Sequence, residues 1–99
     1  MATFVVLFSW TDQGIKSFKD SPSRVDAAKQ AFADLGVEIR DIYWTLGAYD
    51  LVSVIEAPDD EAIIAAMLRL SSLGNVRTST LKLFPEKEFR KVIQSLPAA

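Results

Sequence analysis

The chain has 99 residues, of which 49% are hydrophobic and 24% are charged, and its formal net charge is -2 at pH 7. This balance predicts one globular domain over residues 1–99 and excludes a disordered chain. The chain has 11 Lys and Arg against 13 Asp and Glu, so no basic excess is available to neutralise a run of phosphates, and we expect no nucleic-acid partner. Because the chain has no Cys and no His, thiolate nucleophiles, imidazole bases and the usual metal sites are excluded, and we expect neither metal nor cofactor.

Membrane and export signals are also missing from the sequence. The longest apolar runs, Phe4–Phe8 and Ala62–Leu68, are far shorter than the ~20 residues of a membrane-spanning helix. No basic segment precedes the first apolar run, so a secretory signal is not expected. The sequence therefore predicts a soluble, cytoplasmic protein that does not associate with membranes.

The first predicted strand, Thr3–Trp10, carries β-branched or aromatic residues at both alternating sets of positions. This pattern is typical of a strand that is covered on both faces. The next segment, Thr11–Asp20, contains Gly14 among scattered polar residues, and we expect an irregular connection with a short turn there.

A helix is predicted to begin at Ser21–Ser23. Pro22 suits the first turn, and Ser23 with Asp26 three residues later resembles a capping box in which Asp replaces Glu. Gly36 is expected to end the helix in a left-handed conformation. The apolar stripe of this helix has helical spacing and consists of Val25, Ala28, Phe32 and Leu35.

Five more elements are predicted after Gly36. Val37–Leu46 indicates a strand whose charged residues suit the edge of a sheet, and Tyr49–Ala57 indicates a strand that is apolar on both faces. Pro58–Leu73 predicts a helix with acidic residues in its first turn. Asn75–Phe84 predicts a fourth strand, and Pro85–Pro97 predicts a last helix.

This element order predicts an α+β, ferredoxin-like βαββαβ fold with a C-terminal helix. Right-handed crossovers give a four-stranded antiparallel sheet of order 4-1-3-2, in which the two strands that are apolar on both faces are central. The helices can cover only one face of so small a sheet. We therefore expect a second subunit on the other face, which would make a homodimeric α+β barrel.

Several short segments occur in a characteristic order and spacing along the chain. They are Gln13-Gly14, Lys16, Ser21-Pro22-Ser23-Arg24, Gly47-Ala48-Tyr49-Asp50, Glu56-Ala57-Pro58 and Gly74-Asn75-Val76-Arg77-Thr78. Together they resemble the GYD domain family, which is named for a Gly-x-Tyr-Asp signature. The resemblance covers Phe4–Phe84 and implies a ferredoxin-like, dimeric α+β barrel. It implies no reaction, because the activity of the family is not established.

The signature Gly47–Asp50 has two interpretations. In the structural one it is a hairpin turn, with Gly47 in a conformation that other residues avoid. In the catalytic one Asp50 is a base at the start of a central strand, beside the hydroxyl of Tyr49. An ion pair between Asp50 and Arg24 or Arg77 would remove that base.

A ligand site is also a candidate near the start of the first long helix. Lys16 and Arg24 flank this start, where free backbone N–H groups favour an anion such as a carboxylate or phosphate. The alternative is two solvated cations beside an ordinary helix start. Gln13 and Gly14 would bring the backbone close to the ligand or would only form a turn. The complete candidate ligand set is Gln13, Gly14, Lys16, Arg24, Gly47 and Arg77.

Three functions remain open from the sequence. The first is a homodimer that binds a small anionic or aromatic ligand, with Phe8, Trp10, Tyr43 and Trp44 supplying aromatic surface to the core, the dimer interface or the ligand. The second is a cofactor-independent isomerase or oxygenase that uses Asp50 as a base and Tyr49 as a hydrogen-bond donor. The third is a purely structural interaction module.

Overall fold

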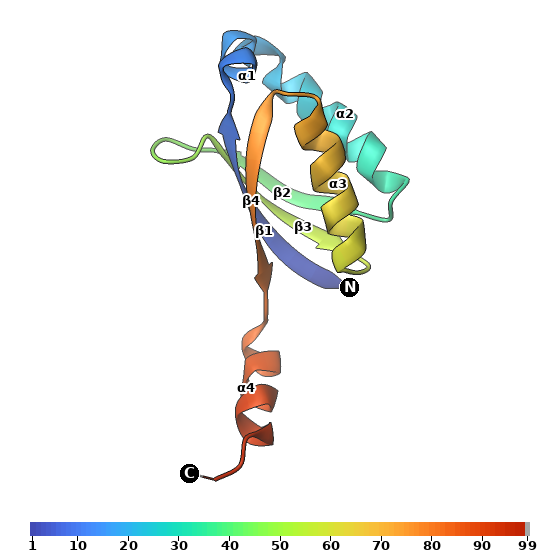
Figure 1. Cartoon of the computed structure of the whole chain (residues 1–99), viewed down its shortest axis with the longest axis vertical. Coiled ribbons are helices and arrows are strands. Elements are labelled where there is room, and N and C mark those ends of the chain that lie inside the picture. The colour runs from blue at the N-terminus through green and yellow to red at the C-terminus, as the bar shows by residue number, and fades with distance from the viewer. Residues whose placement is uncertain (99) are drawn as a thin grey trace.

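The computed structural model describes residues 1–98, which form four strands and five helical segments (Figure 1). None of these helices is long and apolar enough to cross a bilayer. The elements in chain order are β1 (Ala2–Trp10), α1 (Asp12–Lys16), the 3-10 helix η1 (Phe18–Asp20), α2 (Ser21–Ala33), β2 (Glu38–Trp44), β3 (Leu51–Ala57), α3 (Asp60–Ser72), β4 (Val76–Leu83) and α4 (Glu86–Ser95).

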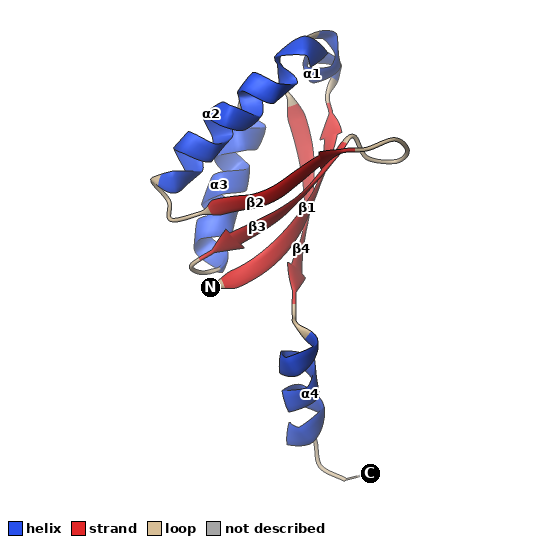
Figure 2. Ribbon diagram, turned by 180° about the vertical axis from the view of Figure 1, so that it is seen from behind, coloured by secondary structure: helices blue, strands red, loops and turns tan. Residues whose placement is uncertain are grey.

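The strands form one antiparallel sheet of order β2-β3-β1-β4. The expected ferredoxin-like order and the α+β class are therefore confirmed. Figure 2 shows α2 and α3 together on one face of this sheet. β1 and β3 are central because their residues are apolar on both sets of positions, whereas the more polar β2 and β4 lie at the edges.

The core lies between the sheet and these two helices. Phe4, Val6 and Phe8 alternate along β1 with their side chains buried on the helix side, and Ile55 does the same on β3. Burial of each such side chain contributes about 1.5–3 kcal/mol. The helices contribute Phe32, Ile63, Ala66 and Met67 to the same cluster.

The segment after β1 is helical and not irregular, contrary to the sequence expectation. Thr11 is the N-cap of α1, and its Oγ1 accepts a hydrogen bond from the N–H of Gly14 at 3.1 Å. A helix of 5 residues is too short to show an apolar period. Its only sequence signal is this cap with Asp12 in the first turn, where a carboxylate is favourable.

The predicted capping box of α2 was wrong. The N-cap is Asp20, whose side chain makes no capping bond, and Ser23 is already inside the helix. The Ser23 hydroxyl donates to the carbonyl of Asp20 at 3.1 Å. Because η1 runs directly into α2, the preceding helical turn replaces the side-chain cap. The expected left-handed Gly36 is confirmed, with φ +71°.

The strands on either side of the signature are shorter than predicted. β2 ends at Trp44 and β3 begins at Leu51. Between them the N–H of Thr45 donates to the carbonyl of Asp50 at 2.8 Å, which closes the loop. Gly47 has φ +122°, so the hairpin interpretation correctly placed a glycine-specific conformation there.

None of residues 1–98 covers the face of the sheet opposite α2 and α3, and we call this face the open face (Figure 2). Its centre is apolar: Val5 stands opposite Val54 on one side and opposite Leu81 on the other. Leu81 is 52% exposed and Tyr43 is 60% exposed. At its margin Arg40 forms an ion pair with Glu56 at 2.9 Å. The apolar centre consists of Val5, Leu7, Val52, Val54, Leu81 and Leu83.

The amino end of α3 provides a test of the observed capping. Asp59 Oδ1 accepts a hydrogen bond from the N–H of Ala62 at 2.8 Å. We expect Asp59→Ala to lower the free energy of unfolding by about 1 kcal/mol, because this N–H loses its partner. Ser23→Ala is the matched control and should stay within about 0.5 kcal/mol of wild type, since this hydroxyl caps no helix N–H. Urea unfolding measures both, and an equal loss in the two variants would contradict the assignment of the caps.

Candidate functional site

A cavity of about 440 Å³ lies between α2 and α3, above the helix-side face of the sheet. Its walls are mainly apolar side chains of both helices and of all four strands. A second, smaller hollow of about 200 Å³ lies between α3 and β4. The apolar walls of the larger cavity include Phe8, Trp10, Val25, Ala28, Ile42 and Leu70.

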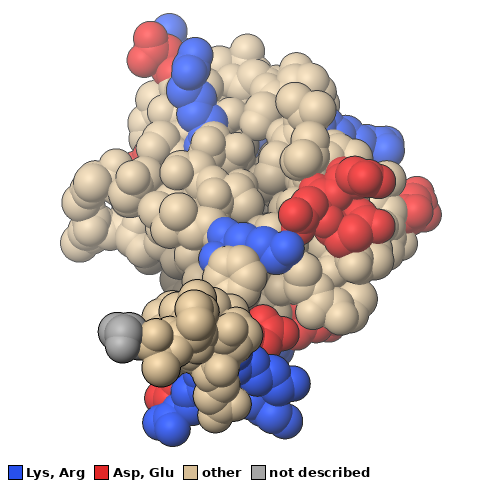
Figure 3. All heavy atoms as spheres, turned by 60° about the horizontal axis from the view of Figure 1, so that its bottom comes forward, with Lys and Arg blue, Asp and Glu red and all other residues tan. Residues whose placement is uncertain are grey.

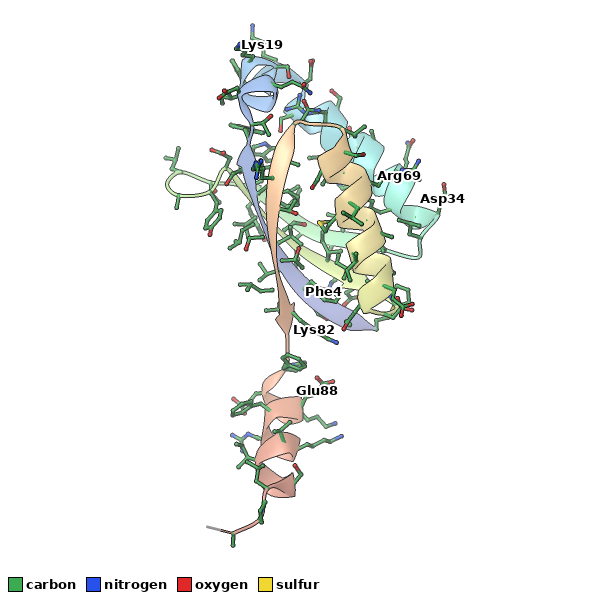
Figure 4. All side chains as sticks on the ribbon, viewed as in Figure 1. Phe4, Lys19, Asp34, Arg69, Lys82 and Glu88 are labelled. Atoms are coloured by element: carbon green, nitrogen blue, oxygen red, sulfur yellow. The ribbon has the colours of Figure 1, made fainter. Side chains whose placement is uncertain are left out.

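Two arginines line this apolar cavity. Arg24 comes from α2. Arg69 comes from the C-terminal half of α3 and is labelled in Figure 4. Neither forms an ion pair with an Asp or Glu within residues 1–98. Their positive charges are therefore available to an anion that enters the cavity.

Arg24 also has a structural role. Its Nη1 donates to the carbonyl of Ser17 at 3.0 Å and to the hydroxyl of Ser17 at 3.1 Å, and its Nη2 donates to the carbonyl of Gly14 at 3.4 Å. These acceptors are neutral, so the hydrogen bonds hold the guanidinium in place without cancelling its charge. Arg24 thus joins α1 to α2 beside the cavity.

Asp50 is bound to the neighbouring strand and not to an arginine. Its Oδ2 accepts a hydrogen bond from the backbone N–H of Trp10 at 2.8 Å, and its own N–H donates to the carbonyl of Phe8 at 2.8 Å. The carboxylate therefore satisfies the backbone N–H of Trp10 at the end of β1, where the next backbone hydrogen bond between the two strands would otherwise form. Neither Asp50 nor Tyr49 lines the two cavities described above.

Gln13 and Gly14 connect α1 to the turn between α3 and β4. Gln13 Nε2 donates to the carbonyl of Leu73 at 3.1 Å and to Asn75 Oδ1 at 3.0 Å. Gly14 is buried against the carbonyl of Asn75, where a Cβ would overlap the oxygen. The sequence analysis left open whether Gln13 and Gly14 approach a ligand or form a turn, and the close approach is made to the chain's own turn between α3 and β4.

The remaining candidates lie apart from the cavity. Lys16 is exposed on α1, Gly47 is exposed in the β2–β3 hairpin, and Arg77 is exposed on β4 opposite Ser9. None of the three lines either described cavity. The sequence analysis missed Arg69, whose only signal was a cation directly after the apolar run Ala62–Leu68 of the second long helix.

The geometry does not offer a metal centre among residues 1–98. No group of three or more Asp and Glu side chains is placed to hold an ion in this part of the chain. The site is instead an apolar cavity with cationic side chains, a composition that suits binding of an amphipathic organic anion.

The fold and this cavity define an α+β, ferredoxin-like protein with an apolar cavity between α2 and α3. A family model described as the GYD domain matches residues 4–93. The chain belongs to the GYD domain family, as the signature around Tyr49 suggested.

Comparisons with known proteins give the same fold. A Thermus thermophilus protein named glutamine synthetase and cystathionine beta-lyase binding protein is 41% identical over 86 residues, which cover 86% of this chain and 90% of that protein. A crystal structure of a Thermus thermophilus protein is 30% identical with a TM-score of 0.55, covering 85% of this chain and 94% of that one. The leucine response regulatory protein of Mycobacterium tuberculosis is 18% identical with a TM-score of 0.65, covering 84% of this chain and 50% of that one.

The role of Asp50 can be tested by comparing two substitutions. Asp50→Ala should lower the free energy of unfolding by about 1–3 kcal/mol, because the N–H of Trp10 loses its acceptor. Asp50→Asn keeps an oxygen that can accept the same hydrogen bond and should lose less than about 1 kcal/mol. Urea unfolding followed by tryptophan fluorescence measures the difference. Equal stability of the two variants would show that this hydrogen bond does not explain the residue.

Proposed function

We propose that this chain is a cytoplasmic, homodimeric binding protein whose cavity between α2 and α3 holds a small ligand with an apolar or aromatic body and an anionic group. The observation that carries the proposal is the pairing of apolar walls with Arg24 and Arg69. A volume of about 440 Å³ falls within the range of roughly 300–1,000 Å³ found for small-molecule sites.

The ligand class follows from the two kinds of surface. Side chains such as Phe8, Val25 and Leu70 favour hydrocarbon or aromatic groups, because binding removes both surfaces from water. Arg24 and Arg69 favour a carboxylate or another planar anion, to which a guanidinium can donate two hydrogen bonds. A fully apolar ligand would leave these charges without a counterion.

Binding is favoured over the isomerase or oxygenase alternative by the position of the catalytic candidates. The carboxylate of Asp50 accepts a hydrogen bond from the backbone N–H of Trp10. Tyr49 is 38% exposed and does not line the cavity. A reaction in the cavity would therefore need a base other than Asp50.

The proposed dimer is supported by the open face. An exposed apolar surface of this kind marks an interaction site, and the apolar strip that includes Val5, Val54 and Leu81 continues across three strands. A second copy offers an identical apolar sheet, and such a two-fold contact is the commonest form of a homodimer.

A second candidate function is binding of a metabolic enzyme. It is favoured by the identity of 41% to the Thermus thermophilus protein, whose name describes binding of glutamine synthetase and cystathionine beta-lyase. The similarity extends over 90% of that protein. The two functions are compatible, since a ligand in the cavity could adjust the affinity for an enzyme.

The cavity proposal is tested with 8-anilinonaphthalene-1-sulfonate, an aromatic anion whose fluorescence rises in apolar sites. We expect Arg69→Gln to weaken its binding about tenfold, because one hydrogen-bonded charge is lost. Lys29→Gln removes the same charge from α2 at an exposed position outside the cavity lining and is the matched control.

Native mass spectrometry of the same preparations reports the number of subunits and any retained ligand. We expect two subunits for wild type, and retained ligand in wild type but less in Arg69→Gln. Equal dye affinity of wild type, Arg69→Gln and Lys29→Gln would contradict a site that uses Arg69.

The second candidate is tested with purified glutamine synthetase and cystathionine beta-lyase from the source organism. Isothermal titration calorimetry should detect saturable binding of at least one enzyme, with a dissociation constant of about 1 μM or lower for a specific contact. The absence of heat with both enzymes, in a preparation that folds by circular dichroism, would remove this function.

A further inference from the structure

The C-terminal helix α4 extends away from the rest of the molecule (Figure 1). β4 leads through Phe84 and Pro85 into α4. Because Pro85 is extended, with φ -58° and ψ 154°, the chain continues beyond the end of the sheet. This extension accounts for the long dimension of 55 Å, against 32 and 19 Å in the other two directions. All residues from 81 to 98 are exposed.

One face of α4 is apolar. Phe89, Val92, Ile93 and Leu96 have helical spacing, and each is more than half exposed. Lys87, Arg90, Lys91 and Gln94 occupy the opposite face. Figure 3, which brings this end of the molecule forward, shows cations gathered on one side of the protruding helix and uncharged side chains over much of the rest.

A helix of this length needs a surface to pack against. Isolated helices shorter than about 12–15 residues are marginal in water, because few hydrogen bonds offset the cost of nucleation. α4 has 10 residues. Its only ion pair within residues 1–98 is the exposed Arg90–Glu86 pair at 2.8 Å, which stabilises a helix by only about 0.3–0.5 kcal/mol.

The open face and α4 adjoin each other. Leu83 of the open face is the last residue of β4, and α4 begins three residues later at Glu86. Any molecule that covers the open face as far as Leu83 therefore lies beside the base of α4. The extended Pro85 carries α4 away from the sheet of its own chain. If a molecule covers the open face, that molecule therefore offers the surface nearest to α4.

The open face alone is smaller than the usual interface of a stable dimer, which indicates that α4 contributes to the contact. Four strands at about 4.8 Å spacing and about 25 Å length give a flat area of roughly 500 Å². Stable interfaces bury about 800 Å² per partner. A helix about 15 Å long and 10 Å wide adds its own contact area to each subunit. Each subunit also buries an equal area where the helix of the other copy lies on it, and the total area per subunit then approaches about 800 Å².

We propose that α4 packs its apolar face against a second copy of this chain, so that each subunit of the dimer covers the helix of the other. This inference rests on the proposed homodimer. α4 carries three cations and two carboxylates, whereas residues 1–83 carry eight cations and eleven carboxylates. These opposite net charges favour the encounter of the helix with the body of another copy, while the cations themselves lie on the face of α4 that is turned away from the proposed contact.

Because the chain has no native Cys, a single introduced cysteine reports on one chosen position. Ile93→Cys places a thiol on the apolar face, and Gln94→Cys places one on the polar face one residue later. At protein concentrations above the dimer dissociation constant, we expect maleimide to modify the Ile93→Cys variant about tenfold more slowly than the Gln94→Cys variant. Dilution below that constant should make the two rates equal.

A second measurement follows the dimer itself by analytical ultracentrifugation. Ile93→Asp should raise the dissociation constant about tenfold or more, because a carboxylate would be buried in the contact. Gln94→Asp carries the same new charge on the polar face and should leave the constant unchanged. Circular dichroism establishes that both variants retain the folded sheet.

The outcomes separate the helix from the sheet contact. Wild type that is monomeric at every concentration would overturn both the proposed dimer and this inference. A wild-type dimer with unchanged affinity in Ile93→Asp and equal maleimide rates would overturn only the role of α4. Slow modification of Ile93→Cys that does not depend on concentration would also overturn it, since the helix would then fold onto its own subunit.

Discussion

β1 and β3 are apolar at both alternating sets of positions, so each turns one set of apolar side chains towards α2 and α3 and a second set away from them. The first set includes Phe4, Val6 and Ile55, which form the buried core. The second set includes Val5 and Val54, which no helix among the described residues covers. Because the two helices occupy one layer only, the same strands that stabilise the fold also create its largest candidate interaction surface. The proposed dimer and the packing of α4 both depend on this constraint.

The hydrogen bonds around α1 show how the family's residues stabilise the fold beside the cavity. Gln13 and Gly14 hold α1 against the turn that precedes β4, and Arg24 holds it against α2. Asp50 completes the end of β1 by accepting the N–H of Trp10. These contacts secure the rim of the cavity, while most of its walls come from apolar side chains outside the segments that resemble the family. The segments that mark the family and the residues that line the cavity are thus largely different sets in this molecule.

The strand order and the long helices could be predicted because they depend on periodicity that single segments carry. The pattern of Thr3–Trp10 and Tyr49–Ala57 distinguished central strands from edge strands, and the structure confirmed the order. α1 was missed because five residues are too few to display a period. The Ser23 capping box was wrong because η1 leads into α2, and a preceding turn of helix is a tertiary feature that the local pattern does not show.

The site could be predicted only in part. Arg24 was named from the sequence and lines the cavity, whereas Arg69 was not, because its importance depends on α3 lying next to α2. Gly14 was also named as a candidate, with a ligand or a turn as its alternatives, but its close neighbour is the carbonyl of Asn75. A contact between residues about sixty positions apart cannot be derived from local spacing.

By itself the amino-acid sequence determined which strands are central, where glycines are needed and which chemistries are missing, because side-chain size, polarity and backbone freedom act locally. The tertiary structure alone decided that Asp50 accepts a backbone N–H, that two arginines share one apolar cavity and that α4 stands clear of the sheet. These features depend on distances between elements, which are set by how the helices and the sheet pack and not by any one segment.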